Sequence, residues 1–361
     1  MTAPFRGIRH LAFLIPGSYA PDAPATGLEE TLRLFAHAEE LGYDSAWVRQ
    51  RHLESGVSSA AVFLAAASQR TSRIGLGSAV IQLDYENPFR LAEDLALADT
   101  LSGGRLNVGV STGPAPFAEI LGELFVPPAP GGRYAQAERL QRALSCQPLA
   151  PDAIAGNAAG KQVPRVQPYS PGLSGRLWYG AGSGASAEWA ARAGFNLLTG
   201  NILSGGTSDD FLTEQLRLIR LFRAGWRGQG SPRVAVGRVI LPTDGASAGT
   251  VDRYRAFAAA RDERTRAPAA NPRRTLYLPD LVGPVEQIAQ RLRADPVLAE
   301  VEELRLELPY EFGGDDYRQI LRDGLRLRDL LAASTLAPAE GSRVGTADDL
   351  IGQAPRAPET A

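Results

Sequence analysis

A strand, a helix and a second strand are predicted by the stretch RTSRIGLGSAVIQLDYENPFRLAEDLALADTLSGGRLNVGVSTG (70–113). Its two apolar segments, 73–83 and 105–112, have the length of buried strands. The helical segment between them opens at Pro88, an allowed first-turn residue, and stops at Gly103 and Gly104. Two strands joined by a crossover helix favour a parallel sheet.

The same alternation of strand and helix continues in both directions from this stretch. Eight strands in alternation with helices predict an α/β fold, the (β/α)8 TIM barrel, with an open doubly wound sheet as the alternative. We expect one catalytic domain over residues 1–335 with a Pro/Gly-rich insertion at 147–175, followed by a flexible tail over 336–361. The expected strands cover residues 8–16, 45–50, 73–83, 105–112, 176–182, 195–201, 233–242 and 301–309.

Composition excludes several classes of protein. The net charge of −2 over 361 residues provides no basic field for nucleic acid. No apolar run is long enough to span a membrane, and the first residues lack the pattern of a signal peptide, so we expect a cytoplasmic protein. Cys146, the single cysteine, excludes an intramolecular disulfide. Lys161 is the only lysine and lies in the insertion, which argues against Schiff-base chemistry.

The segment GAGSGASAEWAA (180–191) is the clearest local signal at the end of an expected strand. Its glycines and the start of the following helix suit a phosphate group, with Ser183 and Ser186 as ligands. In the alternative interpretation, Ser186 only caps the helix. The residues alone leave both interpretations open, and the GxGxG spacing is a weak match to a dinucleotide fingerprint.

Of the three histidines, His52 is the best catalytic candidate, because it follows the second expected strand beside Arg51 and Glu54. His10 lies within the first strand, where it can reach the barrel interior, and His37 is expected on a helix surface. No HxH, HxxxH or CxxC spacing occurs, so no metal site is predicted. Nucleophilic catalysis has little support, since Cys146 falls at the end of an expected helix.

Four segments together resemble the bacterial luciferase-like flavin monooxygenases. The stretch 70–113 is similar to the central signature of that family. Three further segments are similar to its flanking blocks, in the family's order, so that the resemblance covers residues 8–333. These segments are AHAEELGYDSAWVRQRH (36–52), GAGSGASAEWAARAG (180–194) and LVGPVEQIAQRLRAD (281–295).

This resemblance implies a (β/α)8 barrel that binds FMN at the strand ends. In many members a separate NAD(P)H:flavin reductase supplies reduced FMN, which reacts with O2 to a C4a-peroxyflavin that oxygenates a small organic substrate. The resemblance also implies a homodimer, for which the small-residue helix at 57–70 is a candidate face.

The family's site residues carry over onto specific positions of this chain. The family places a non-proline cis peptide beneath the flavin ring, which corresponds here to Ala79–Val80. The family's phosphate turn corresponds to Gly182, Ser183 and Ser186, and this favours the phosphate interpretation of the two serines. The family's fourth-strand residues near the ring and phosphate correspond to Ser111 and Thr112.

Two departures from the luciferase pattern point away from luciferase activity itself. The family's pair of histidines after the second strand is Arg51–His52 here, and an arginine cannot act as a base although it can hold an anion. Thr112 stands where luciferase has a phosphate-binding arginine, so a phosphate either takes its charge from elsewhere or binds more weakly. We therefore expect a monooxygenase acting on another small organic substrate, with Arg51 and His52 as catalytic candidates.

A dry pocket is needed for such chemistry. We expect a lid from segments 113–132, 147–175 and 204–207, and a pocket lined by Trp47, Tyr85, Phe117 and Trp178, unless these aromatic residues belong to the core. Three alternatives stay open: a deazaflavin-dependent oxidoreductase that transfers hydride without O2, a non-catalytic flavin-binding relative, and a flavin-free barrel enzyme with a phosphorylated metabolite at 180–186.

Overall fold

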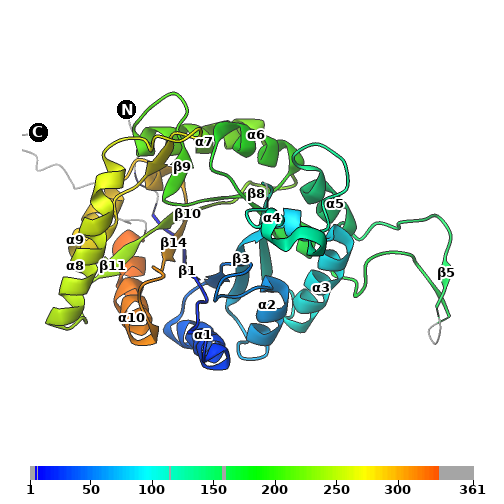
Figure 1. Cartoon of the computed structure of the whole chain (residues 1–361), viewed down its shortest axis with the longest axis horizontal. Helices are drawn as coiled ribbons and strands as arrows, with labels where there is room; N and C mark the ends of the chain where they lie inside the picture. The colour runs from blue at the N-terminus through cyan, green and yellow to red at the C-terminus, as the bar shows by residue number, and fades with distance from the viewer. Residues whose placement is uncertain (1–4, 6, 114, 157–159, 333–361) are drawn as a thin grey trace, which may run out of the picture.

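Eight parallel strands close into a barrel in the computed structural model, which describes residues 5, 7–113, 115–156 and 160–332 (Figure 1). The first and last strands pair, with His10 opposite Glu303 and Leu14 opposite Glu307. The predicted barrel is confirmed, and the alternative of an open sheet is wrong. Each strand lies within one predicted segment: β1 (His10–Ile15), β2 (Ser45–Val48), β3 (Gly75–Gln82), β4 (Leu106–Ser111), β7 (Leu177–Gly180), β8 (Asn196–Thr199), β10 (Val234–Arg238) and β14 (Glu303–Glu307).

Helices surround the barrel on its outside (Figure 1). The start of α3 shows how the sequence sets a boundary: the Asn87 side chain accepts the backbone N–H groups of Phe89 and Arg90 at 3.0 and 3.1 Å, and Pro88 takes the first position. The helices are α1 (Pro24–Leu41), α2 (Ala60–Ser68), α3 (Pro88–Leu101), α4 (Ala118–Leu121), α5 (Ala135–Leu144), α6 (Gly184–Ala193), α7 (Phe211–Gly225), α8 (Ala248–Asp262), α9 (Val285–Arg293) and α10 (Gly314–Leu331).

Short strands outside the barrel extend two of its connections. The apolar run predicted as one strand over 233–242 is divided, because the chain leaves the barrel after Arg238 and its continuation pairs elsewhere. The short pairs are β11 (Ile240–Pro242) with β13 (Leu281–Gly283), and β9 (Ile202–Ser204) with β12 (Thr275–Tyr277). Short 3-10 helices lie at η1 (Leu83–Tyr85), η2 (Gly122–Leu124), η3 (Leu173–Arg176), η4 (Glu263–Thr265) and η5 (Leu298–Glu300).

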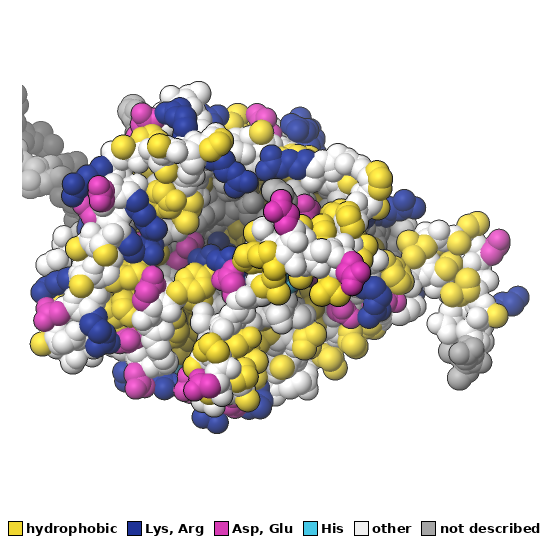
Figure 2. Space-filling model, in the orientation of Figure 1, with side chains coloured by type: hydrophobic (Ala, Val, Ile, Leu, Met, Phe, Trp, Pro, Cys, Tyr) yellow, Lys and Arg dark blue, Asp and Glu magenta, His cyan; other side chains and the backbone are white. Residues whose placement is uncertain are grey.

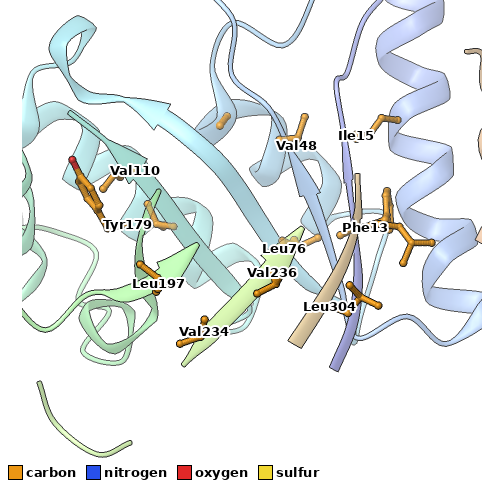
Figure 3. Close-up of a cluster of buried hydrophobic side chains, with 14 of the residues drawn as sticks. Phe13, Ile15, Val48, Leu76, Val110, Tyr179, Leu197, Val234, Val236 and Leu304 are labelled. Carbon is orange, nitrogen blue, oxygen red and sulfur yellow. The ribbon is translucent and has the colours of Figure 1, made fainter. Parts of the chain in front are cut away.

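The main core lies between the barrel wall and the helices. Successive strand residues point to opposite sides of the wall, so every second side chain meets the helices. Phe13, for example, packs edge-on against Phe35 of α1 with ring centroids 5.7 Å apart. Figure 3 shows members of this layer from several strands, including Leu76, Val110 and Leu304, all fully buried. Both faces of each strand are therefore covered, which explains the continuous apolar runs in the sequence.

Two tryptophans fill the inside of the barrel. Trp47 and Trp178 meet edge to face with centroids 5.6 Å apart and planes at 89°. A Cβ atom at Gly77 would lie 2.2 Å from the Trp47 ring, so β3 needs a glycine opposite this indole. Both indoles are fully buried, and they belong to the barrel core beneath the carboxyl ends of the strands.

The insertion at 147–175 lies at the amino-terminal end of the barrel. It follows α5 and leads into β7, and connections from helix to strand lie opposite the active-site end of such a barrel. Ser170 hydrogen-bonds the Asp99 carboxylate near the end of α3, and the hairpin of β5 (Ile154–Ala155) and β6 (Lys161–Gln162) projects from the body (Figure 1). The prediction that this insertion forms part of a lid is therefore wrong.

Among the described residues, no helix has both the length and the apolar character needed to cross a membrane. The tail predicted over 336–361 lies outside the described residues, so the division into a domain over 1–335 and a tail stays a prediction.

Candidate functional site

Two hollows adjoin at the carboxyl ends of the barrel strands. The first has a volume of about 250 Å³ and the second of about 580 Å³, and Gly180 and Gly182 line both. Figure 2 shows this face hollowed over the barrel. All seven residues predicted to bind the cofactor line one hollow or the other: Ala79, Val80 and Gly182 the first, and Ser111, Thr112, Gly182, Ser183 and Ser186 the second. The fold thus brings together residues of β3 and β4, of the segments that follow β4 and β7, and of helix α6.

The floor of the first hollow includes the Ala79–Val80 peptide, which is cis as predicted. It lies at a bulge, where the pairing register of β3 and β4 shifts between Ser78 and Ile81. The Ser78 hydroxyl donates to the carbonyl oxygen of Gly109 at 3.0 Å and accepts the Gly109 N–H at 3.1 Å. One serine side chain therefore satisfies the backbone groups of β4 where the ladder is interrupted.

Hydroxyl groups gather in the second hollow around the start of α6. Ser183 is the N-cap of α6, and its Oγ accepts the Ser186 N–H at 3.3 Å while Ser186 Oγ accepts the Ser183 N–H at 3.2 Å. The N-cap is thus Ser183 and not Ser186, which occupies the third helical position, and both side chains take part in capping the helix. On the adjacent strand, the Thr112 hydroxyl lies 2.7 Å from the hydroxyl of Tyr179.

Arg133 and Arg273 line the same hollow and were missed in the sequence. Neither forms an ion pair within the part of the chain that the structure describes. Arg133 lies over the ring of its neighbour Tyr134 at 5.7 Å, and both arginines are exposed. The two arginines bring positive charge to this hollow. Their only signal in the sequence is their position in the glycine- and proline-containing turns GGR and NPR.

His52, the histidine predicted as a catalytic candidate, lies outside the lining of both hollows. Its ring stacks on Tyr85 with centroids 4.1 Å apart, and its Nε2 lies 3.1 Å from the amide nitrogen of Gln50. Since that amide group can only donate, His52 Nε2 accepts and the proton of the neutral ring is on Nδ1. Burial lowers the pKa of His52, although the Glu54 carboxylate acts in the opposite direction.

Arg51 also lies outside the lining of both hollows. Its Nε donates to the Tyr310 hydroxyl at 2.9 Å, and its guanidinium lies over the Tyr310 ring at 5.4 Å. Arg49, two residues earlier, faces the same ring at 5.7 Å and does line the first hollow. A catalytic role for Arg51 and His52 stays a prediction, and Arg49 is the basic residue of this segment that reaches the hollow.

Three charged side chains meet in the first hollow: Arg49, Arg305 and Glu307. Arg49 Nη2 lies 3.1 Å from Glu307 Oε2. A Cβ at Gly237 would lie 1.9 Å from Glu307 Oε1, so the neighbouring strand leaves space for this carboxylate. The sequence signal was the segment ELRLEL (303–308), in which charged residues alternate with leucines, since alternate strand residues face the barrel interior.

The aromatic residues predicted to line the pocket are placed around it instead. None of the four is part of the lining of either hollow. Trp47 and Trp178 belong to the barrel core, whereas the Tyr85 hydroxyl accepts the backbone N–H of Phe117 at 3.0 Å. This contact anchors the segment after β4 at the edge of the site.

Sequence comparison connects this arrangement to known proteins. The chain matches the family model described as luciferase-like monooxygenase over residues 10–303. Limonene 1,2-monooxygenase of Rhodococcus erythropolis is 39% identical over 127 residues, which are 34% of this chain and 32% of that protein. The 4-hydroxyprotoasukamycin monooxygenase of Streptomyces nodosus subsp. asukaensis is 36% identical over 107 residues, 29% of each chain. The alignments thus span less than a third of these two relatives.

A longer match joins the chain to a relative with a different named activity. An F420-dependent glucose-6-phosphate dehydrogenase of Kineococcus radiotolerans is 27% identical over 273 residues, 72% of this chain and 78% of that protein.

Solved structures share the barrel fold. Apo-MsnO8 superposes with a TM-score of 0.66 at 18% identity, covering 91% of this chain and 98% of that chain. The oxygenating constituent of 3,6-diketocamphane monooxygenase from Pseudomonas putida, in complex with FMN, gives a TM-score of 0.64 at 15% identity, covering 92% and 98%. At these identities the likeness shows the fold alone.

Proposed function

The chain belongs to the luciferase-like monooxygenase family, and from this membership we propose that it binds FMN across the two hollows and uses reduced FMN and O2 to oxygenate a small organic substrate. The observation that carries the proposal is the junction of the two hollows at Gly180 and Gly182. One hollow has a floor suited to a flat ring, and the other has the hydroxyls and cations suited to a phosphate.

The second hollow fits the phosphate end of FMN. Ser183 and Ser186 present hydroxyls at the start of the ten-residue helix α6, whose free N–H groups favour an anion. The guanidinium groups of Arg133 and Arg273, which have no acidic partner among the described residues, can form charge-assisted hydrogen bonds to phosphate oxygens. Neutralisation of a phosphate therefore does not need an arginine at position 112, where this chain has a threonine.

The first hollow fits the ring end. Ala79 and Val80 form its floor, and Leu14, Leu198 and Gly180 supply apolar or small walls. When bound there, reduced flavin supplies the electrons that activate O2. The residues of this chain would hold the ring against the floor, keep water away from it and orient the substrate.

Water exclusion falls to the segments that follow strands at this end of the barrel. Tyr85 anchors the segment after β4. The exposed fractions of its apolar residues Ile120, Leu124 and Val126 are nevertheless 75%, 79% and 82%. Closure of this segment over a bound ligand would bury these side chains, which gives the closed state a hydrophobic stabilisation. The predicted lid segments 113–132 and 204–207 are both at this end.

The proposal includes two partners. A separate NAD(P)H:flavin reductase would supply reduced FMN, and a second copy of the chain would pack against α2, whose Val62 is 67% exposed. We expect the purified chain to be a dimer and the Val62→Asp variant to be a monomer. This result would support α2 as the dimer interface.

An anaerobic fluorescence titration with oxidised and photoreduced FMN, followed by an O2 pulse, tests the function. We expect reduced FMN to bind more tightly, and the O2 pulse to produce a flavin absorbance distinct from both the reduced and the oxidised forms. Rapid formation of oxidised FMN alone would contradict the monooxygenase proposal. Tight binding of a deazaflavin in preference to FMN would instead support hydride transfer, the alternative that the F420-dependent relative favours.

A further inference from the structure

Arg305 holds a buried positive charge, and two of its guanidinium nitrogens have no hydrogen-bond partner among the described residues. Its side chain lines the first hollow, and only 3% of the residue is exposed. Neither Nε nor Nη1 has a hydrogen-bond partner among the described residues. Buried polar groups are nearly always hydrogen-bonded, and a buried cation without a partner destabilises a fold. A bound molecule that accepts hydrogen bonds from Arg305 would explain why these nitrogens have no partner.

The acidic side chains near Arg305 are already engaged. Glu307, the carboxylate with the largest electrostatic effect on it, is paired with Arg49 at 3.1 Å. Glu303, two residues before it on the same strand, is paired with Arg233 at 2.7 Å. Within the described part of the chain, the first hollow therefore contains two guanidinium groups and one carboxylate, which leaves one positive charge in excess.

The other neighbours of Arg305 do not compensate this charge. Its guanidinium lies over the Trp47 ring at 5.2 Å, a contact that stabilises a cation but accepts no strong hydrogen bond. Burial lowers the pKa of Arg305 to about 10, so the group stays charged at neutral pH. The Nε of Arg49, which also lines the hollow, likewise has no partner among the described residues.

We propose that Arg305 and Arg49 bind a planar organic anion in the first hollow, a carboxylate-like group with two neighbouring acceptor atoms. This inference rests on the proposed function, since it names the chemistry of what enters the same site. Two sources can supply such a group: the carboxylate of an organic-acid substrate, or the anionic edge of the reduced flavin ring. Oxidised FMN, whose ring is neutral, does not supply it.

The experiment uses two matched pairs of probes on wild type and on Arg305→Met. Benzoate and benzamide have the same shape but differ in charge, and they are titrated against the flavin-free protein by calorimetry. Reduced and oxidised FMN are titrated anaerobically by fluorescence. A substrate carboxylate site predicts that wild type prefers benzoate to benzamide by about tenfold or more, and that Arg305→Met abolishes this preference.

The ring-edge source predicts a different pattern. In that case Arg305→Met lowers the affinity for reduced FMN by about tenfold or more, whereas the affinity for oxidised FMN stays within about twofold of wild type. The proposal is overturned if wild type does not distinguish benzoate from benzamide and Arg305→Met binds both forms of FMN as wild type does. If wild type binds no FMN at all, the proposed function fails, whereas the benzoate comparison on flavin-free protein still decides the anion site.

A thermal melt of the flavin-free protein separates binding from a structural role. Removal of an uncompensated buried charge raises the melting temperature of Arg305→Met, whereas a structural cation would lower it. Arg49→Gln, which keeps the chain polar at that position, provides a second variant with the same expected loss of benzoate preference. Arg9→Met, at a side chain 72% exposed, is the control and leaves all four affinities unchanged.

Discussion

The hydroxyl of Ser78 bridges both backbone groups of Gly109, donating to its carbonyl oxygen at 3.0 Å and accepting its N–H at 3.1 Å. Ser78 is fully buried, and it precedes the bulge that forms the floor of the first hollow. A Cβ at Gly109 would lie 2.2 Å from the Ser78 carbonyl oxygen, so the two strands are in close contact here. The position of the floor depends on this pair.

Ser78→Ala should therefore weaken both stability and flavin binding. The substitution leaves the buried N–H and C=O of Gly109 without a partner, which costs about 1–3 kcal/mol of unfolding free energy. The measurement is urea denaturation together with FMN titration. Ser55→Ala, at an exposed serine, is the matched control and should change neither quantity. An unchanged denaturation midpoint for Ser78→Ala would show that water or a neighbour replaces the hydroxyl.

The barrel could be predicted because its strands and helices are determined by patterns within short segments of the sequence. Strands such as β3 and β4 are covered on both faces, so they appear as continuous apolar runs, and the helix between them carries its own start and stop residues at Pro88 and Gly103. Residues that follow such strands, among them Thr112 and Ser183, could be assigned to the site because barrel topology brings strand ends together.

Other parts of the site could not be predicted, since they depend on long-range contacts. Arg133 and Arg273 lie in turns without periodicity, and only the fold brings both to the second hollow. Arg305 and Glu307 alternate with leucines, a pattern typical of many strands, and only closure of the barrel brings both side chains to the first hollow. The insertion at 147–175 was assigned to the wrong end of the barrel, although its position between a helix and a strand already indicates the amino-terminal end.

Shortening the hairpin of the insertion should leave flavin binding intact. The backbone N–H of Leu149 donates to the carbonyl oxygen of Pro164 at 2.6 Å, so the two ends of the segment 150–163 already meet. Replacing this segment with a short glycine-serine link should keep FMN affinity within about twofold, because short loops close at little entropic cost. Removal of 118–126 at the opposite end is the contrasting variant and should impair FMN binding. Equal losses in both variants would contradict the assignment of the two ends.

Stability should fall as the pH drops below about 6.5. Burial lowers the pKa of both His10 and His52 from the ordinary value of 6.5, so the unfolded chain takes up protons before the native chain does. The stability contributed by the neutral rings is thus present above pH 6.5 and is lost as the pH falls toward the lowered native values. Urea denaturation between pH 5 and 8 measures the slope, which His52→Gln should reduce. An identical slope in this variant would show that His52 titrates normally.

Arg133→Ala and Arg273→Ala should each weaken the binding of FMN by about 10- to 100-fold, since each removes a charge-assisted contact to phosphate. Riboflavin, which lacks the phosphate, should bind the variants and wild type with equal affinity, because the ring end of the site is unchanged. The two ligands are compared by fluorescence titration at one salt concentration, since both arginines are exposed and ions screen their charge. Arg9→Met again serves as the matched control. A parallel loss of riboflavin affinity would place the arginines at the ring and not at the phosphate, and an unchanged FMN affinity in both variants would remove the second hollow from the flavin site.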